Sequence, residues 1–295
     1  GPVSFTFSVQ DNGGTANAGA DWSTSAATMT LNIAAVNDAP VLTVTAPAMA
    51  GVNEDAGVPS GAVGTLVSAL VSGVSDLDAA ALKGVAITAA NSANGSYYYS
   101  LNNGTSWTAF PAVSSAASLL LAADSNTRVY FKPTANFNGT VSDALTFRAW
   151  DQSTGTAGTT ANTTTNGSTT AFSSATDTVS VAVAAVNDAP TVSSELVAQT
   201  ATQDVSFSYT FGAGSFADVD TGDALTYSAS LANGGSLPSW LVFNPATRTF
   251  SGTPTNGDVG TITVKVTATD TGNLTASSTF SLNVTDVNDA PTGNV

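Results

Sequence analysis

The sequence predicts an all-β fold, a tandem of Greek-key β-sandwich domains arranged end to end. Three observations favour this class. Short stretches in which apolar and polar side chains alternate recur along the 295 residues, and this period of two is typical of strands with one buried face. Turn-forming residues separate the stretches at short intervals, as they do in sandwiches. One junction motif occurs three times, which indicates repeated domains.

The junction motif reads AAVNDAP at residues 34–40 and, unchanged, at residues 184–190, with the variant TDVNDAP at residues 285–291. Each copy directly follows an alternating strand. Its proline then ends the strand, because proline has no N–H to donate to a neighbouring strand. A last strand followed by a short connector is the pattern expected at a domain boundary.

These junctions divide the chain into four parts. The expected parts are the two C-terminal strands of a truncated preceding repeat (residues 1–39), a long repeat (residues 40–189), a shorter repeat (residues 190–290) and the start of the next linker (residues 291–295). The first part is assigned by alignment, because FTFSVQD at residues 5–11 matches LTFRAWD at residues 145–151. Two strands alone are marginally stable, so this part either belongs to a domain cut short or completes a sheet with another chain.

Within the repeats, turn residues and alternation locate individual strands. In the long repeat, Asn102-Asn103-Gly104 predicts a hairpin turn between two strands, because Asn-Gly is a strong turn signal. Further predicted strands lie at residues 97–101, 106–110, 128–131, 145–147, 206–211, 225–228 and 261–266. Residues 152–174 are rich in Thr, Gly, Asn and Ser, which predicts a long, exposed and mobile loop.

Composition and charge exclude several functions. The 21 acidic residues outnumber six basic ones, and the net charge of −15 disfavours nucleic acid and anionic membrane surfaces as partners. No stretch reaches the roughly 20 apolar residues of a membrane span. The absence of Cys and His excludes thiol catalysis, Ser-His-Asp triads and zinc sites built from these ligands. We therefore expect a non-enzymatic protein without nucleic-acid binding or membrane insertion.

Acidic residues recur at the same three landmarks of each repeat: the junction, an Asp-x-Asp in an early loop, and the end of the penultimate strand. Loops at one end of a sandwich lie together, and gathered carboxylates repel one another unless a cation lies between them. Oxygen ligands in flexible geometry favour Ca²⁺. The predicted ligands are Asn37, Asp38, Asp76, Asp78 and Asp151 at the first junction, and Asn187, Asp188, Asp218, Asp220 and Asp270 at the second. The alternative explanation is turn chemistry, because Asp favours turns.

This arrangement resembles cadherin repeats, whose linker motif is Asp-x-Asn-Asp-x-x-Pro and whose following domain supplies Asp-x-Asp and a late Ala-x-Asp. The sequence departs from that motif, because Ala35 and Ala185 stand where its first Asp belongs. The resemblance therefore implies fewer or weaker ions per linker. Glu54 lies where cadherins place a Glu that reaches the next linker, which makes it a further candidate ligand. Other acidic residues near the motifs are Asp223, Asp286 and Asp289, the last two of which would serve a following domain.

Two longer matches refine the resemblance. LPSWLVFNPATRTFSGTP at residues 237–254 resembles the dystroglycan-type cadherin-like domain, also known as the putative Ig domain. FKPTANFNGT at residues 131–140 resembles the core motif of cadherin-like repeats in giant bacterial surface adhesins. The resemblance implies an extracellular array, secreted or on a bacterial cell surface. In such an array Ca²⁺ rigidifies neighbouring repeats of the same chain, which act as a spacer that supports adhesion.

Two other functions stay open. The chain could be a self-associating subunit of an extracellular filament, sheath or surface layer, as the incomplete N-terminal part suggests. It could instead be a module that binds a cell-surface glycan or protein ligand. A sugar-stacking platform could be formed by Trp22, Trp107, Trp150, Trp240 and the run Tyr97–Tyr99. Core and cross-strand packing is the favoured role of these aromatic residues.

Overall fold

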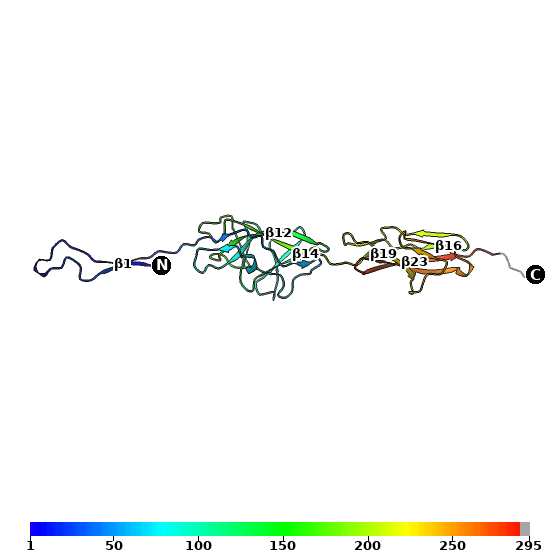
Figure 1. Cartoon of the computed structure of the whole chain (residues 1–295), viewed down its shortest axis with the longest axis horizontal. Coiled ribbons are helices and arrows are strands. Elements are labelled where there is room, and N and C mark those ends of the chain that lie inside the picture. The colour runs from blue at the N-terminus through cyan, green and yellow to red at the C-terminus, as the bar shows by residue number, and fades with distance from the viewer. Residues whose placement is uncertain (290–295) are drawn as a thin grey trace, which may run out of the picture. The chain divides into compact units, whose positions relative to one another are not determined.

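The computed structural model describes residues 1–289, which are nearly all in strands and loops (Figure 1). The chain divides into two units, Gly1–Ala184 and a second that starts at Ala185. Each unit contains a β-sandwich, so the chain is all-β with tandem sandwich domains, as the alternating pattern predicts. The helical segments among the described residues are short 3₁₀ turns, and none is long and apolar enough to cross a bilayer. These turns are Ala16–Ala18, Val67–Leu70 and Asn256–Asp258.

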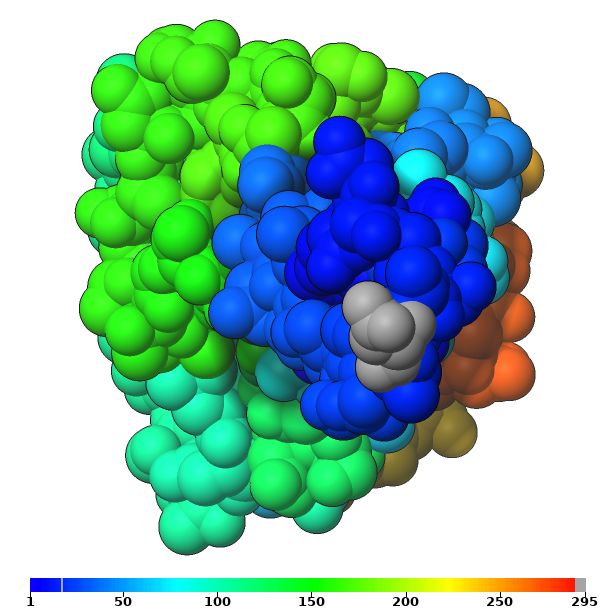
Figure 2. Space-filling model, turned by 90° about the vertical axis from the view of Figure 1, so that its left-hand side faces the viewer, coloured from blue at the N-terminus to red at the C-terminus, as the bar shows by residue number. Residues whose placement is uncertain are grey.

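The first unit begins with a hairpin of two antiparallel strands, β1 (Val3–Phe7) and β2 (Ala27–Leu31), in which Phe5 lies opposite Met29. Among residues 1–289 these strands pair only with each other. The hairpin has one apolar face, whose side chains Val3, Phe5, Phe7, Met29 and Leu31 are between 40% and 60% exposed. Figure 2 accordingly shows the hairpin, in dark blue, as surface atoms. Its origin as the end of a preceding repeat stays a prediction.

The rest of the first unit is the long repeat. Its larger sheet has the order β13 (Thr160–Ala161), β10 (Ser118–Ala122), β7 (Gly84–Ala90), β12 (Gly139–Trp150), β14 (Asp177–Ala184) and β4 (Val52–Asn53). The facing sheet has the order β5 (Thr65–Leu66), β11 (Arg128–Pro133), β8 (Gly95–Ser100) and β9 (Thr108–Ala109). A short pair, β3 (Val41–Leu42) and β6 (Val74–Ser75), lies apart from both. Strand β4 runs parallel to β14, whereas the other pairings are antiparallel.

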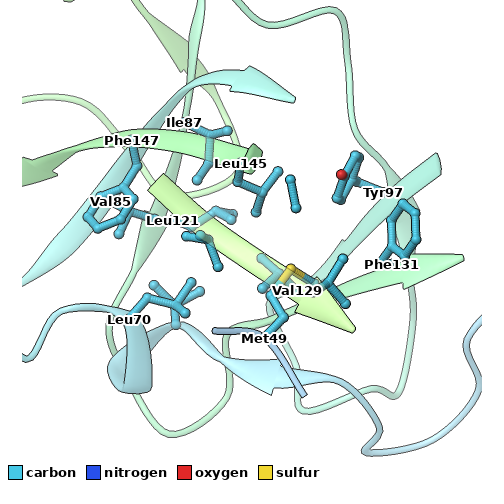
Figure 3. Packing of buried hydrophobic residues seen from close by; sticks show 14 of the residues in the cluster. Met49, Leu70, Val85, Ile87, Tyr97, Leu121, Val129, Phe131, Leu145 and Phe147 are labelled. Atoms are coloured by element: carbon cyan, nitrogen blue, oxygen red, sulfur yellow. The ribbon is translucent and has the colours of Figure 1, made fainter. Parts of the chain in front are cut away.

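Alternate side chains of the two sheets meet in the core of the long repeat. Figure 3 shows Ile87 and Leu145 from the larger sheet and Val129 and Phe131 from the facing sheet, all fully buried. Phe131 packs against Tyr97 with ring centroids 5.0 Å apart. Burial of aromatic and branched side chains from both sheets is the main source of sandwich stability, so this repeat has a core of its own.

The second unit has the same connectivity with fewer strands. One sheet has the order β16 (Gln199–Thr202), β23 (Thr275–Thr285), β22 (Gly260–Thr269) and β19 (Thr226–Leu231). The other has the order β17 (Phe207–Thr210), β21 (Thr249–Gly252) and β20 (Val242–Asn244), and a short pair is formed by β15 (Thr191–Val192) and β18 (Phe216–Ala217). Strand β16 runs parallel to β23, as β4 does to β14. The shared pairings identify equivalent positions in the two repeats.

The prediction that residues 152–174 form a long, exposed loop holds for only part of the segment, because the rest is fixed to the larger sheet. Strand β13 in this segment pairs with β10. Ala171 and Phe172 pack with Leu120 and Trp150 in a separate apolar cluster on the larger sheet. The error has a physical reason: a few apolar side chains without strand or helix periodicity are enough to fix a polar segment to a sheet, and composition does not show them.

A buried carboxylate joins the start of the long repeat to its last strand. Asp177, at the start of β14, is 2% exposed. Its Oδ2 accepts a hydrogen bond from the Thr45 N–H at 2.7 Å, and its Oδ1 accepts from the Thr178 N–H at 2.8 Å. The Ala46 N–H lies 3.2 Å from either oxygen. Backbone donors thus satisfy a charge that would be costly to bury alone.

We expect Asp177→Ala to destabilise the long repeat by about 2 kcal/mol, because it removes several backbone hydrogen bonds to a buried, charged acceptor. Hydrogen exchange of β14 amides would measure the change separately in this repeat. Asp143→Ala is the matched control, because Asp143 bonds to Asn91 on the exposed surface and its loss should cost little. Equal effects of the two substitutions would contradict this role for Asp177.

Candidate metal sites at two junctions

The first junction gathers its predicted residues within the first unit. Asn37 Nδ2 donates to Asp151 Oδ2 at 2.9 Å, and the Asp38 N–H donates to Asp78 Oδ2 at 2.8 Å. The Asp78 N–H in turn donates to Asp76 Oδ1 at 2.9 Å. The connector, the loop after β6 and the end of β12 therefore meet, as the positions of the acids along the sequence suggest.

The second unit repeats this geometry. Asn187 Nδ2 donates to Asp270 Oδ2 at 2.9 Å, and the Asp188 N–H donates to Asp220 Oδ2 at 2.8 Å. The Asp220 N–H donates to Asp218 Oδ1 at 3.0 Å. In each unit the connector residues thus bond to the repeat that follows them. Ligation of an ion by either set stays a prediction.

Local structure places each acid. The first Asp of each Asp-x-Asp accepts from the backbone two residues on, which forms an Asx turn. The late Asp at the end of the penultimate strand is almost fully buried, with 6% exposure for Asp151 and 5% for Asp270. Its second oxygen accepts from a nearby backbone N–H, that of Ser153 or Leu274, in both cases at 2.7 Å. Turn chemistry therefore explains one oxygen of each acid.

Turn chemistry does not explain the remaining oxygens. Asp76 Oδ2 and its equivalent Asp218 Oδ2 are buried and have no hydrogen-bond partner within residues 1–289. A buried, unpaired carboxylate oxygen costs free energy comparable to a lost charged hydrogen bond. A cation bound to that oxygen would remove the cost. Carboxylate and carbonyl oxygens without nitrogen or sulfur donors form the set that suits Ca²⁺, so the residues present fit this ion.

The two sites differ by one carboxylate. The Asp223 N–H bonds to the Asp220 carbonyl, just as the Ala81 N–H bonds to the Asp78 carbonyl, both at 3.2 Å. Asp223 and Ala81 are therefore equivalent. Carboxylate oxygens of Asp218, Asp220 and Asp223 lie within 4.8 Å of one another. Asp223 Oδ1 accepts a short hydrogen bond from Thr271, and its Oδ2 is another buried oxygen without a partner in the described part of the chain.

A second difference involves Glu54, which follows β4, and Gln203, which follows β16. The N–H of Glu54 bonds to Ala184 O at 2.9 Å and that of Gln203 to Thr285 O at 3.0 Å, so the two residues are equivalent. Glu54 Oε2 accepts from Asn138 Nδ2 at 2.9 Å. Its expected role toward the following junction stays a prediction. Sequence reasoning missed Gln203, because only the strand register aligns it with Glu54.

Gln203 organises the third junction motif. Its Nε2 donates to Asp289 Oδ2 at 3.0 Å and to Asp204 Oδ2 at 3.2 Å, and its Oε1 accepts from the Val287 N–H at 3.3 Å. A neutral amide thus bridges two carboxylates where the first unit carries Glu54. The expected linker start at residues 291–295 lies outside the described residues.

Comparison with known proteins found one family model, which matches the second repeat. Residues 189–285 match the model of the family described as "Putative Ig domain". This match covers a minority of the chain, so it assigns a fold to the second repeat and leaves the rest to the strand topology above. No curated protein matches the chain.

Similar solved structures include cadherins and a polysaccharide hydrolase. Mouse cadherin-23 EC22–24 has a TM-score of 0.48 at 15% identity, covering 92% of this chain and 72% of that one. Protocadherin gamma B7 extracellular cadherin domains 1–4 have a TM-score of 0.45 at 16% identity, covering 90% and 55%. An endo-fucoidan hydrolase of glycoside hydrolase family 107 has a TM-score of 0.29 at 16% identity, covering 97% and 34%, so this chain spans about a third of that enzyme.

The hydrogen bond from the Asp188 N–H to Asp220 leads to a prediction that can be tested without a metal ion. We expect the Asp188 amide to be protected from hydrogen exchange in a chelator-treated sample. Asp220→Ala should lower its protection about fivefold, because a net hydrogen bond to a charged acceptor at a solvated site contributes about 1 kcal/mol. The amide of Asp38, which bonds to Asp78 in the other unit, is the internal control and should not change. Unaltered protection at Asp188 would show that this bond does not hold the connector.

Proposed function

We propose that this chain is a non-catalytic, extracellular repeat segment of a large bacterial surface adhesin, in which Ca²⁺ rigidifies the junctions of a spacer that supports adhesion. The observation that carries the proposal is the duplicated set of five oxygen-donor residues, each set with a buried carboxylate oxygen that has no partner within residues 1–289. Domains of the Ig and cadherin type are usually extracellular and non-catalytic, which supports the same function.

The proposed role of the acids is electrostatic. Two carboxylates 4.8 Å apart, the limit found among Asp218, Asp220 and Asp223, repel by about 1 kcal/mol in water and about 3.5 kcal/mol near a protein surface. A divalent cation would turn this repulsion into attraction. The Asp-x-Asp loop would hold the ion from the repeat, and Asp188 would hold it from the connector. The connector would then lose freedom, because its backbone already bonds to the same loop.

The same reasoning applies to the first junction with one acid fewer. Asp76, Asp78 and Asp151 would supply repeat carboxylates, and Asp38 would supply the connector carboxylate. Ala81 stands where the second unit has Asp223. Fewer negative charges should give a lower affinity, so the two sites should fill at different concentrations.

We expect the chelator-treated chain to bind Ca²⁺ with dissociation constants of about 10⁻⁴ to 10⁻³ M, the range of extracellular modules. Isothermal titration should resolve a tighter and a weaker site. Asp220→Asn should abolish the tighter one and Asp78→Asn the weaker one. Asp223→Ala should bring the tighter site close to the affinity of the weaker one. Small-angle scattering should show a narrower distribution of maximum dimension once the ion is added.

Two controls make this experiment decisive. Asp143→Asn removes an exposed acid outside both sites and should leave the titration unchanged. Near-ultraviolet circular dichroism should stay constant on chelation, because each sandwich has its own apolar core. If the ion does not bind at millimolar concentration, or binds equally well to Asp220→Asn, the acids are turn residues and the spacer proposal loses its mechanism.

A second candidate function is a self-associating subunit of an extracellular filament, sheath or surface layer. The observation that favours it is the exposed apolar face of the β1–β2 hairpin, because a one-sided apolar hairpin of two strands needs a partner to be stable. We expect self-association to appear as concentration-dependent sedimentation. The paired substitution Phe5→Ser and Met29→Ser should then abolish association. A monomer at all concentrations would exclude the filament and leave the spacer proposal intact.

A further inference from the structure

A shallow groove of about 380 Å³ opens on the first unit, between the segment at residues 58–61 and the β8–β9 hairpin loop. It is separate from both clusters of acids. The lining residues are Val58, Pro59, Ser60, Gly61, Tyr98, Gly104, Thr105, Ser106 and Trp107. This list contains no charged residue, although the chain as a whole carries a net charge of −15.

Aromatic rings gather at this groove on the outer face of the β5–β11–β8–β9 sheet. Tyr98 in β8 and Tyr130 in β11 lie opposite each other, and their strand neighbours Tyr97 and Phe131 point into the core. The Trp107 ring meets that of Tyr130 edge to face, with centroids 6.0 Å apart. None of these three rings belongs to a core cluster among the described residues, although Tyr130 itself is buried, with 8% exposure. Cross-strand packing, one of the roles expected for these aromatics, accounts for the Tyr98–Tyr130 pair, but it leaves part of the Tyr98 and Trp107 rings exposed.

The walls of the groove are fixed by hydrogen bonds. Trp107 Nε1 donates to Gly61 O at 3.1 Å. The Arg128 guanidinium donates to Asn103 Oδ1 at 2.7 Å and to Gly64 O at 3.2 Å, so it joins chain segments that adjoin the two walls. Gly104 has φ of 83°, and a Cβ there would overlap the Gly61 carbonyl. A ligand would thus meet a preformed surface, which lowers the entropic cost of binding.

The exposed groups define what could bind. Tyr98 and Trp107 are half-buried, so part of each ring faces solvent. Within residues 1–289, the hydroxyl groups of Tyr98 and Ser60 have no hydrogen-bond partner, whereas the Thr105 hydroxyl is already bonded to Asn102 O. Aromatic surface beside free hydroxyl groups, without charge, complements a ligand with apolar C–H faces and many neutral hydroxyls. The net charge of −15 of the whole chain disfavours an anionic ligand.

We propose that this groove binds a neutral saccharide. One face of a sugar ring would lie on Tyr98 and Trp107, and its hydroxyls would bond to Tyr98 and Ser60. The site is independent of the cation sites, because no acid lines it. It would give the long repeat a ligand of its own in addition to any spacer role.

The test uses the full chain and a panel of defined oligosaccharides: cellohexaose, maltohexaose, xylohexaose and mannohexaose, with hexagalacturonate as the anionic comparison. Binding is measured by isothermal titration and by chemical-shift changes of residues 58–61 and 104–107. We expect at least one neutral hexasaccharide to bind. Tyr98→Ala and Trp107→Phe should each lower its affinity about tenfold, as for an aromatic residue central to a binding site.

Matched variants separate binding from folding. Trp22→Ala is the control, because Trp22 is 56% exposed and lies outside the groove, so it should leave the affinity unchanged. Tyr98→Phe removes only the hydroxyl and should lower affinity less than Tyr98→Ala. If Trp107→Phe unfolds the repeat, Tyr98→Ala still tests the site, because Tyr98 is not a core residue. The proposal is overturned if no neutral hexasaccharide binds at millimolar concentration, or if Tyr98→Ala binds it equally well. It is also overturned if hexagalacturonate binds more tightly. A proline-rich peptide is tested in the same titration, and binding of this peptide alone would likewise overturn the proposal.

Discussion

The placement of each connector depends on the hydrogen bond between its Asp N–H and an Asp carboxylate of the following repeat. This bond joins Asp38 to Asp78 and Asp188 to Asp220. This bond gives the connector N–H an acceptor that no neighbouring strand provides, because the proline that follows ends strand pairing. The fixed connector lies beside the other acids of the junction. The junction is thus a local concentration of negative charge in a chain with few charges elsewhere, and the buried free oxygens of Asp76 and Asp218 follow from it.

The low overall charge of the chain leaves few groups that could neutralise the acids at the junctions. Charged residues form 9% of the chain, so few basic groups compete for the junction acids. Lys83 and Arg128, for example, donate to backbone carbonyls. The sandwich faces rely on Thr, Ser and Asn instead, which hydrogen-bond without adding charge. Cation binding would therefore act at the junctions, whereas the stability of each sandwich would depend on its apolar core.

Much of this organisation could be predicted from the sequence, because alternation, turn residues and a repeated motif are local signals. The co-location of Asn187, Asp220 and Asp270 followed from the rule that loops at one end of a sandwich meet. Relations that need strand register could not be predicted. The equivalence of Ala81 with Asp223, and of Glu54 with Gln203, becomes visible only when hydrogen bonds align the two repeats. The packing of Phe172 was not predicted, because most of its neighbours in the sequence are polar and show no strand or helix periodicity.

The parallel pairing of a short early strand with the last strand of each repeat has a mechanical consequence. In the second repeat, Gln199–Thr202 runs parallel to Leu282–Thr285. Tension on the chain pulls the N-terminal end of β16 one way and the C-terminal end of β23 the other. The load therefore lies along the strands, and the hydrogen bonds between them must break together in shear rather than one by one. In the first repeat, β4 and the bridge from Ala48 to Ser180 give β14 the same arrangement. Under tension, each sandwich would thus be loaded along its paired strands rather than across them.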